Sequence, residues 1–145
     1  MKIQTKAYGL IEIDEKQRIA FPSGLYGFEQ YHDYALIDAH QPPFYWLQSL
    51  DDPQTAFVLI NPYVFRPDYV LEVPDGDLEE IGSPPEEDLL VFAIVTIPED
   101  NTEITANLQG PIIINRKSRY GKQAITLNQA WQTKHVIVSE LARKS

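Results

Sequence analysis

Short runs of branched and aromatic residues, each followed by a polar turn, dominate the first half of the chain. Apolar and polar residues alternate from Ile3 to Ala7, and further short apolar runs lie at 10–13, 19–21, 34–38, 44–50 and 56–60. Runs of this kind, about four to eight residues long and bounded by turn residues, are typical of β-strands. The first half therefore predicts a succession of strands that begins as a meander.

Residues 61–74 contain three prolines, so they predict an edge strand or a bulged element, because an inner strand needs the amide hydrogen that proline lacks. At strand spacing, Phe65, Tyr69 and Leu71 would share one face. Two interpretations are open. These side chains either form an exposed docking edge beside unpaired backbone groups, or they fill the interior of the fold.

Two short helices are predicted next, because Asp77–Glu80 and Ser83–Glu86 both have the spacing of a capping box, the second with Pro84 at the first helical position. The longest apolar run, residues 89–97, follows them and predicts a central strand that is buried on both faces.

A β-hairpin is predicted over residues 107–125, where the apolar run 112–114 enters a polar turn and leaves toward Ala124 and Ile125. Beyond it, Trp131 and residues 136–138 leave room for one last short element, and residues 143–145 are expected to fray. About ten short strands with frequent turns predict an all-β fold with one or two short helices, a small closed or nearly closed antiparallel β-barrel. The length of 145 residues suits one domain spanning residues 1–145.

Charge is distributed unevenly along the chain, whose formal net charge is −9. Residues 67–103 hold twelve carboxylates and no lysine or arginine, which suits a basic partner. The hairpin turn, by contrast, carries four basic residues: Arg116, Lys117, Arg119 and Lys122. That turn could bind phosphates with Tyr120 as a stacking surface, or its cations could balance neighbouring carboxylates, and the negative total charge favours the second interpretation.

Catalytic and metal-binding chemistry have little support, so we expect no enzyme activity, no cofactor and no metal. Cysteine is absent, as are nucleophile motifs and phosphate-binding loops. Asp51 and Asp52 could act as an acid–base pair only if a turn bends them together, since neighbours in a strand point to opposite faces. His32 and His40 have weak metal-site spacing and are expected to lie in solvated loops. Without a signal peptide or an apolar span, we expect a cytoplasmic protein that does not bind membranes.

Four ordered segments resemble the FliW family of bacterial flagellar assembly factors, and the likeness covers nearly the whole chain. They are Phe-Pro-Ser-Gly-Leu-Tyr-Gly-Phe-Glu at 21–29, Trp-Leu-Gln-Ser at 46–49, Ala-Phe-Val-Leu-Ile-Asn-Pro at 56–62, and Ala-Asn-Leu-Gln-Gly-Pro-Ile-Ile-Ile-Asn at 106–115, the last followed by Gly-Lys-Gln. Together these matches are specific, although any one of them would not be.

The resemblance implies a non-catalytic β-barrel that binds two proteins: the helical C-terminal region of flagellin and the RNA-binding translational repressor CsrA. Separately, we expect a monomer. In the family picture, flagellin holds the factor until flagellin is exported, and the freed factor then relieves CsrA repression of flagellin translation. The family's acidic CsrA-binding position corresponds to Glu72. We expect Glu72, Asp68 and Asp75 to form the charged rim of a CsrA site, with Phe65, Tyr69 and Leu71 as its apolar part. The alternative function is RNA or anion binding by the Arg116–Lys122 turn.

Overall fold

A computed structural model describes residues 1–99 and 103–137, and within them the chain forms ten strands, one short α-helix and three turns of 3-10 helix. The strands are β1 (Lys2–Thr5), β2 (Gly9–Glu12), β3 (Arg18–Ala20), β4 (Asp33–Asp38), β5 (Phe44–Ser49), β6 (Ala56–Ile60), β7 (Leu89–Thr96), β8 (Thr105–Asn115), β9 (Gly121–Gln123) and β10 (His135–Val136). The helices are η1 (Glu15–Gln17), η2 (Pro62–Val64), α1 (Asp75–Glu80) and η3 (Glu86–Asp88).

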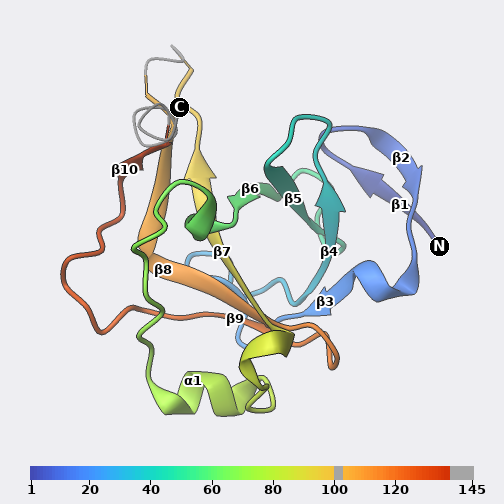
Figure 1. The fold of residues 1–145 in the computed structure, drawn as a ribbon. Helices are drawn as coiled ribbons and strands as arrows, with labels where there is room; N and C mark the ends of the chain where they lie inside the picture. Colours follow the sequence, from blue (N-terminus) through green and yellow to red (C-terminus); the bar gives the residue numbers. More distant parts are fainter. Residues whose placement is uncertain (100–102, 138–145) are drawn as a thin grey trace.

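Seven antiparallel strands, paired in the order β3-β4-β5-β6-β7-β8-β9, curve into a nearly closed barrel, and this confirms the predicted fold class (Figure 1). At the seam, the amide of Ala20 donates a 2.9 Å hydrogen bond to the carbonyl of Arg119, which joins the end of β3 to the hairpin turn. The hairpin can approach Phe21 this closely only because residue 121 is glycine. A Cβ at that position would lie 2.6 Å from the ring of Phe21. The predicted hairpin is therefore the element that closes the barrel.

The inside of the barrel holds one apolar cluster to which β3–β8 all contribute. Leu47, Leu59 and Phe92 are among its buried members, and they alternate along their strands with residues that point outward. β7 pairs with β6 on one side and β8 on the other, which confirms that residues 89–97 contain a central strand.

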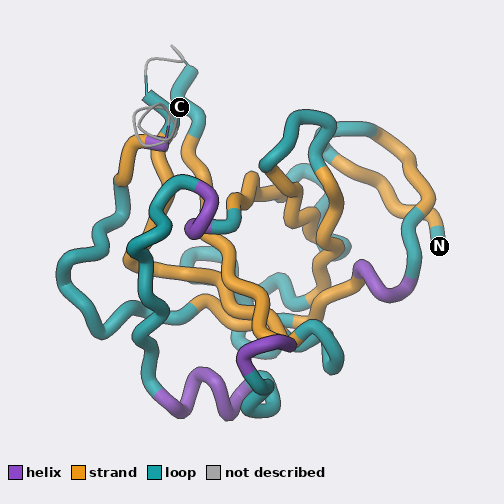
Figure 2. Tube along the Cα trace, in the orientation of Figure 1, coloured by secondary structure: helices purple, strands orange, loops and turns teal. Residues whose placement is uncertain are grey.

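Three segments cover separate parts of the barrel's outer face (Figures 1 and 2). The β1–β2 hairpin lays Ile3 and Ile13 over β4. The 61–73 loop and the stretch around Trp131 cover β6, β7 and the first half of β8. The segment containing α1 places Ile81 against Ile113 of β8. The outer face thus has three apolar clusters of its own.

The prediction of a strand within residues 61–74 is wrong. The Asn61 side chain accepts a hydrogen bond from the amide of Tyr63 and starts η2, with Pro62 at its first position, and the rest of the segment is a loop. Prolines remove the amide donors that a strand would need, and here they also favour a turn.

The two predicted capping boxes are not formed either. α1 begins at Asp75 after Pro74, without a side-chain cap, and Ser83 has a positive φ of 46° that no helix start adopts. η3 begins at Glu86, after Pro85, which is two residues later than predicted. A capping box does form at Asp14–Gln17, where we predicted only a polar turn. The last short element predicted from the sequence corresponds to β10. Val138 and residues 143–145 lie outside the described residues.

Candidate functional site

Glu72 lies at the centre of an exposed surface on the acidic part of the chain. Its backbone carbonyl accepts hydrogen bonds from the amide of Leu127 at 2.7 Å and from the hydroxyl of Thr126 at 3.3 Å. These bonds hold residues 126–127 beside residues 70–73. Val70 is 55% exposed and Leu127 is 65% exposed, so each of the two backbone segments that meet at Glu72 carries an exposed apolar side chain. We call Val70, Leu71, Glu72 and Leu127 the Glu72 patch.

A hollow of about 670 Å³ adjoins this patch, and Val70 and Leu71 belong to its lining. Tyr63 and Leu78 line it as well, and Tyr63 is 41% exposed. Its floor reaches the inner cluster of the barrel, because Phe92 lines the hollow and packs inside. The Glu72 patch is therefore continuous with an open concave surface that is rich in apolar side chains.

Phe65 and Tyr69 are not part of an exposed edge, which corrects that interpretation of the sequence. Phe65 is 1% exposed and Tyr69 is 2% exposed, because the 61–73 loop turns both side chains onto the outer face of the barrel. Tyr69 packs against Trp131 at a ring distance of 5.0 Å, and burial raises the pKa of its hydroxyl. The alternative, that these side chains fill the interior, is right only in that both are buried, because they cover the barrel from outside rather than filling it.

Asp68 is exposed, but its carboxylate is already bound. Arg66 donates two hydrogen bonds to it, at 2.9 Å and 2.8 Å, and these hold the pKa of Asp68 below its usual value. The guanidinium of Arg66 also lies 4.9 Å from the centre of the Trp131 ring. Asp75 is exposed in the first turn of α1, and Leu71 is half-buried. Of the predicted site residues, Glu72 and Leu71 thus lie together on the patch.

Sequence reasoning missed two members of the patch, Val70 and Leu127. Strand spacing puts Val70 on the face opposite Tyr69 and Leu71, and that assignment failed with the strand itself. Leu127 follows the hairpin in sequence, and nothing local indicates that its amide bonds to Glu72, 55 positions earlier. The available signal was an isolated apolar residue in a polar stretch, Thr126-Leu127-Asn128-Gln129.

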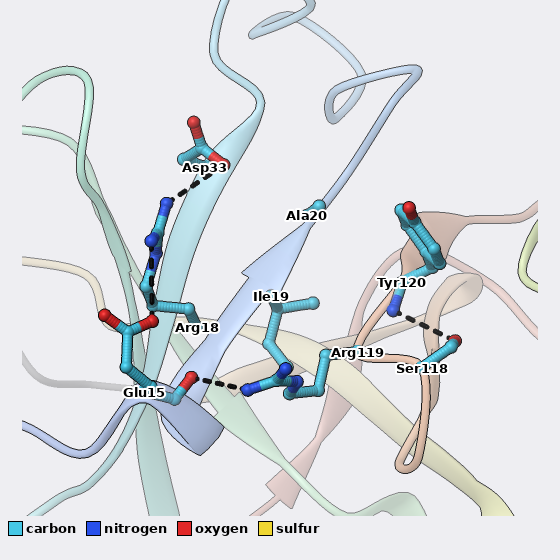
Figure 3. A pocket seen from close by; sticks show the side chains of 8 residues that line it. All are labelled: Glu15, Arg18, Ile19, Ala20, Asp33, Ser118, Arg119 and Tyr120. Carbon is cyan, nitrogen blue, oxygen red and sulfur yellow. Dashed lines mark hydrogen bonds and ion pairs between the residues drawn. The ribbon is translucent and has the colours of Figure 1, made fainter.

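All four cations of the hairpin turn have partners. Arg116 lies 2.7 Å from Asp88, and Lys117 lies 3.6 Å from the same carboxylate. Arg119 donates a 2.9 Å bond to the backbone carbonyl of Glu15, across a small hollow of about 190 Å³ at the barrel seam (Figure 3).

Lys122 binds two carboxylates of α1. Its ammonium lies 3.3 Å from Asp77 and contacts Glu80, which also accepts a hydrogen bond from Ser23. The bond with Glu80, and then that with Asp77, raises the pKa of Lys122, and the bonds from Lys122 and Ser23 lower the pKa of Glu80. Arg116, Lys117 and Lys122 therefore balance neighbouring carboxylates, as the second interpretation of the turn predicted, whereas Arg119 binds a backbone carbonyl.

Asp51 and Asp52 stabilise a turn. Asp51 accepts hydrogen bonds from the amides of His32 and Asp33, and Asp52 accepts bonds from Thr55 and the amide of Gln54. These bonds lower the pKa of both carboxyls, whereas a general acid needs a raised pKa.

His32 and His40 contact different residues. His32 contacts the carbonyl of Phe21 through Nδ1, and His40 stacks on Tyr8. Within residues 1–99 and 103–137, no group of three or more histidine and carboxylate side chains is arranged to hold a metal ion.

Comparison with known proteins identifies the family. The family model described as FliW protein matches residues 2–137. The chain belongs to the FliW family. It is 52% identical to the flagellar assembly factor FliW of Treponema denticola, over 97% of this chain and 96% of that protein. It is also 49% identical to the FliW of Treponema pallidum, over 99% of this chain and 96% of the relative.

The fold agrees with that assignment. A crystal structure of the flagellar assembly factor FliW superposes on this chain with a TM-score of 0.86 and 39% identity, covering 94% of this chain and 96% of the other. FliW proteins are assembly factors, a class of binding or regulatory protein rather than of enzymes. Among the described residues of this FliW chain, no helix is long and apolar enough to cross a membrane.

Proposed function

We propose that this FliW protein acts as a partner switch in the cytoplasm, binding flagellin and the translational repressor CsrA in turn. While flagellin is abundant, flagellin holds the protein. After flagellin is exported, the free protein binds CsrA and prevents it from repressing flagellin translation. Membership of the FliW family supports this function, and it requires only protein–protein binding by a monomer.

The observation that carries the CsrA half of the proposal is the state of Glu72. Its side chain is exposed, and within the described part of the chain it forms no hydrogen bond or ion pair. The flanking Val70 and Leu127 supply apolar surface beside that charge. An unpaired carboxylate between apolar side chains suits a basic protein, because the charge can pair across the interface while the apolar groups are buried.

We refine the CsrA site accordingly. Glu72 and Leu71 remain its members, joined by Val70 and Leu127, and Asp75 contributes charge at the start of α1. Asp68 contributes less charge to the site than predicted, because Arg66 neutralises it locally. Phe65 and Tyr69 contribute indirectly, because their buried side chains pack the 61–73 loop, which carries Glu72, against the barrel.

The concave surface beside the patch suits the helical segment of flagellin. An amphipathic helix binds by laying its apolar face into an apolar groove, and the 670 Å³ hollow offers Tyr63, Leu71 and Leu78 for such a face. Because the hollow and the patch share Val70 and Leu71, the two partners would compete for one region. Such competition lowers the apparent affinity of each partner in proportion to the free concentration of the other over its dissociation constant.

Separate calorimetric titrations test this proposal. The purified protein is titrated with CsrA and, independently, with the C-terminal segment of flagellin. We expect saturable binding to each at a molar ratio of one site per FliW chain. A folded protein that binds neither partner would contradict the proposed function.

A further inference from the structure

A second hollow, of about 510 Å³, lies on the outer face of the barrel, and none of its lining residues belongs to the Glu72 patch. It occurs where the apolar cluster under the β1–β2 hairpin meets the cluster under the 61–73 loop. Residues of the β1–β2 turn and of the β4–β5 turn form its walls, and β5 and β6 form its floor. Its volume falls within the range of small-molecule sites, about 300–1,000 Å³.

Aromatic side chains form a fixed corner in this hollow. Tyr8 stacks on His40 with ring centres 4.0 Å apart and an angle of 24°, and it meets Trp46 edge-on at 6.5 Å. The hydroxyl of Tyr8 accepts hydrogen bonds from the indole of Trp46 at 3.1 Å and from the amide of His40 at 2.9 Å. These bonds tie three segments together, so the corner is organised before any ligand arrives.

The floor of the hollow is apolar and remains partly open. Phe44, Val58 and Ile104 line it and are half-buried, and Ile97 at its edge is 51% exposed. A flat apolar group can therefore rest on the floor and against the aromatic corner, where offset or edge-to-face ring contacts are favourable.

The charge of the lining residues indicates the sign of the charge on the ligand. Lys6 and His40 line the hollow, whereas no carboxylate does, although the chain carries 21. Lys6 forms no ion pair within the described part of the chain, while its backbone amide is fixed by the side chain of Gln48 at 2.9 Å. An unpaired ammonium at the rim of an aromatic hollow favours an anionic ligand with a ring.

We propose that this hollow binds a small aromatic carboxylate, with the ring against Tyr8 and Trp46 and the carboxylate against Lys6. This inference is independent of the partner switch, because none of its residues belongs to the Glu72 patch. Binding of such a ligand could then regulate the protein separately from its protein partners.

Trp46 and Trp131 are the two tryptophans of the chain, and they provide a reporter and an internal control. The probe is indole-3-acetate, added to ¹⁵N-labelled full-length protein while the two indole N–H signals are followed. We expect the Trp46 signal to shift saturably, with a dissociation constant of about 1 mM or tighter, and the Trp131 signal to stay in place. Equal shifts of both signals, or no saturation, would overturn the proposal.

Charge recognition is tested with indole-3-acetamide, the neutral analogue, and with Lys6→Gln. Each change should weaken binding about threefold, as expected for an exposed ion pair, whereas Lys2→Gln on the same hairpin should leave the affinity unchanged. Lys2 and Lys6 are both exposed, so neither variant threatens the fold. Equal affinity for the acid and the amide, or an unchanged affinity in Lys6→Gln, would show that the carboxylate is not recognised and would contradict the proposal.

Discussion

The amide of Leu127 donates a 2.7 Å hydrogen bond to the carbonyl of Glu72, joining a segment after the last hairpin to the loop before α1. The bond uses backbone atoms alone, so both side chains remain free to face outward. It joins two residues with exposed side chains, one apolar and one acidic, from segments that sequence patterns treat as unrelated. The proposed CsrA site depends on this arrangement.

Leu127→Ser should weaken CsrA binding by about 1–2 kcal/mol, because the partner would then bury less apolar surface, while the backbone bond to Glu72 remains. Leu10→Ser is the matched control, since Leu10 is 64% exposed and Leu127 is 65% exposed, and Leu10 lies on β2. Calorimetry gives the affinities, and thermal melts show that both variants remain folded. An equal effect of the two substitutions would remove Leu127 from the interface.

Glu72→Lys should weaken CsrA binding by about 1–3 kcal/mol, because a carboxylate that pairs with a basic partner is replaced by a like charge. Glu87→Lys makes the same charge change at another exposed position of the acidic segment, and it should cost much less. Titrations at two salt concentrations measure the electrostatic part. If affinity and its salt dependence both stay unchanged in Glu72→Lys, Glu72 does not contact CsrA.

Replacing Arg116 and Arg119 together with glutamine should lower stability and leave partner binding intact. Asp88, whose side chain is 6% exposed, loses its closest cation, and the Glu15 carbonyl loses its bond from Arg119. We expect a loss of about 1–2 kcal/mol in the free energy of unfolding, measured by urea denaturation. The prediction fails if the folded double variant loses affinity for CsrA or flagellin, since the hairpin turn would then be a binding surface.

Lys122→Met should flatten the dependence of stability on pH at both ends. The folded-state pKa of Glu80 lies below its unfolded value of about 4.5, so its contribution is present above that pH and disappears as pH falls through the folded value. The pKa of Lys122 is raised above 10.5, so its contribution is present below that pH and disappears as pH rises through the folded value.

Thermal melts across the pH range measure this effect, and Lys134→Met at an exposed position serves as the control. The control should retain the wild-type profile. A Lys122→Met variant whose melting temperature varies with pH as in the wild type would mean that the bonds to α1 contribute nothing to stability.

The barrel could be predicted from the sequence because its strands carry their signal locally. Alternation and branched residues identify β4, β5, β6 and β7, and the glycine-containing hairpin turn identifies β8 and β9. The paired hairpin cations were also foreseeable from the balance of charge. The strand signals depend on residues that are neighbours in sequence or on one strand, whereas the cations were predicted only to be balanced, and their partners are distant in sequence.

The covering segments could not be predicted in the same way. Phe65 and Tyr69 have strand spacing, but prolines bend their segment, and tertiary contacts with Trp131 decide where the side chains point. The capping-box spacing at Ser83 did not start a helix at that residue, because the backbone there turns through a positive φ, and η3 begins only at Glu86. The Glu72 patch likewise arises from a contact between distant loops, which local patterns do not encode.

The most direct test of the partner switch is a calorimetric titration of CsrA into the protein, repeated with the C-terminal segment of flagellin present at ten times its own dissociation constant. Competition for one region predicts an apparent CsrA affinity about elevenfold weaker, with full recovery when flagellin is omitted. An unchanged CsrA affinity in the presence of bound flagellin would contradict the account, because the two partners would then bind independently.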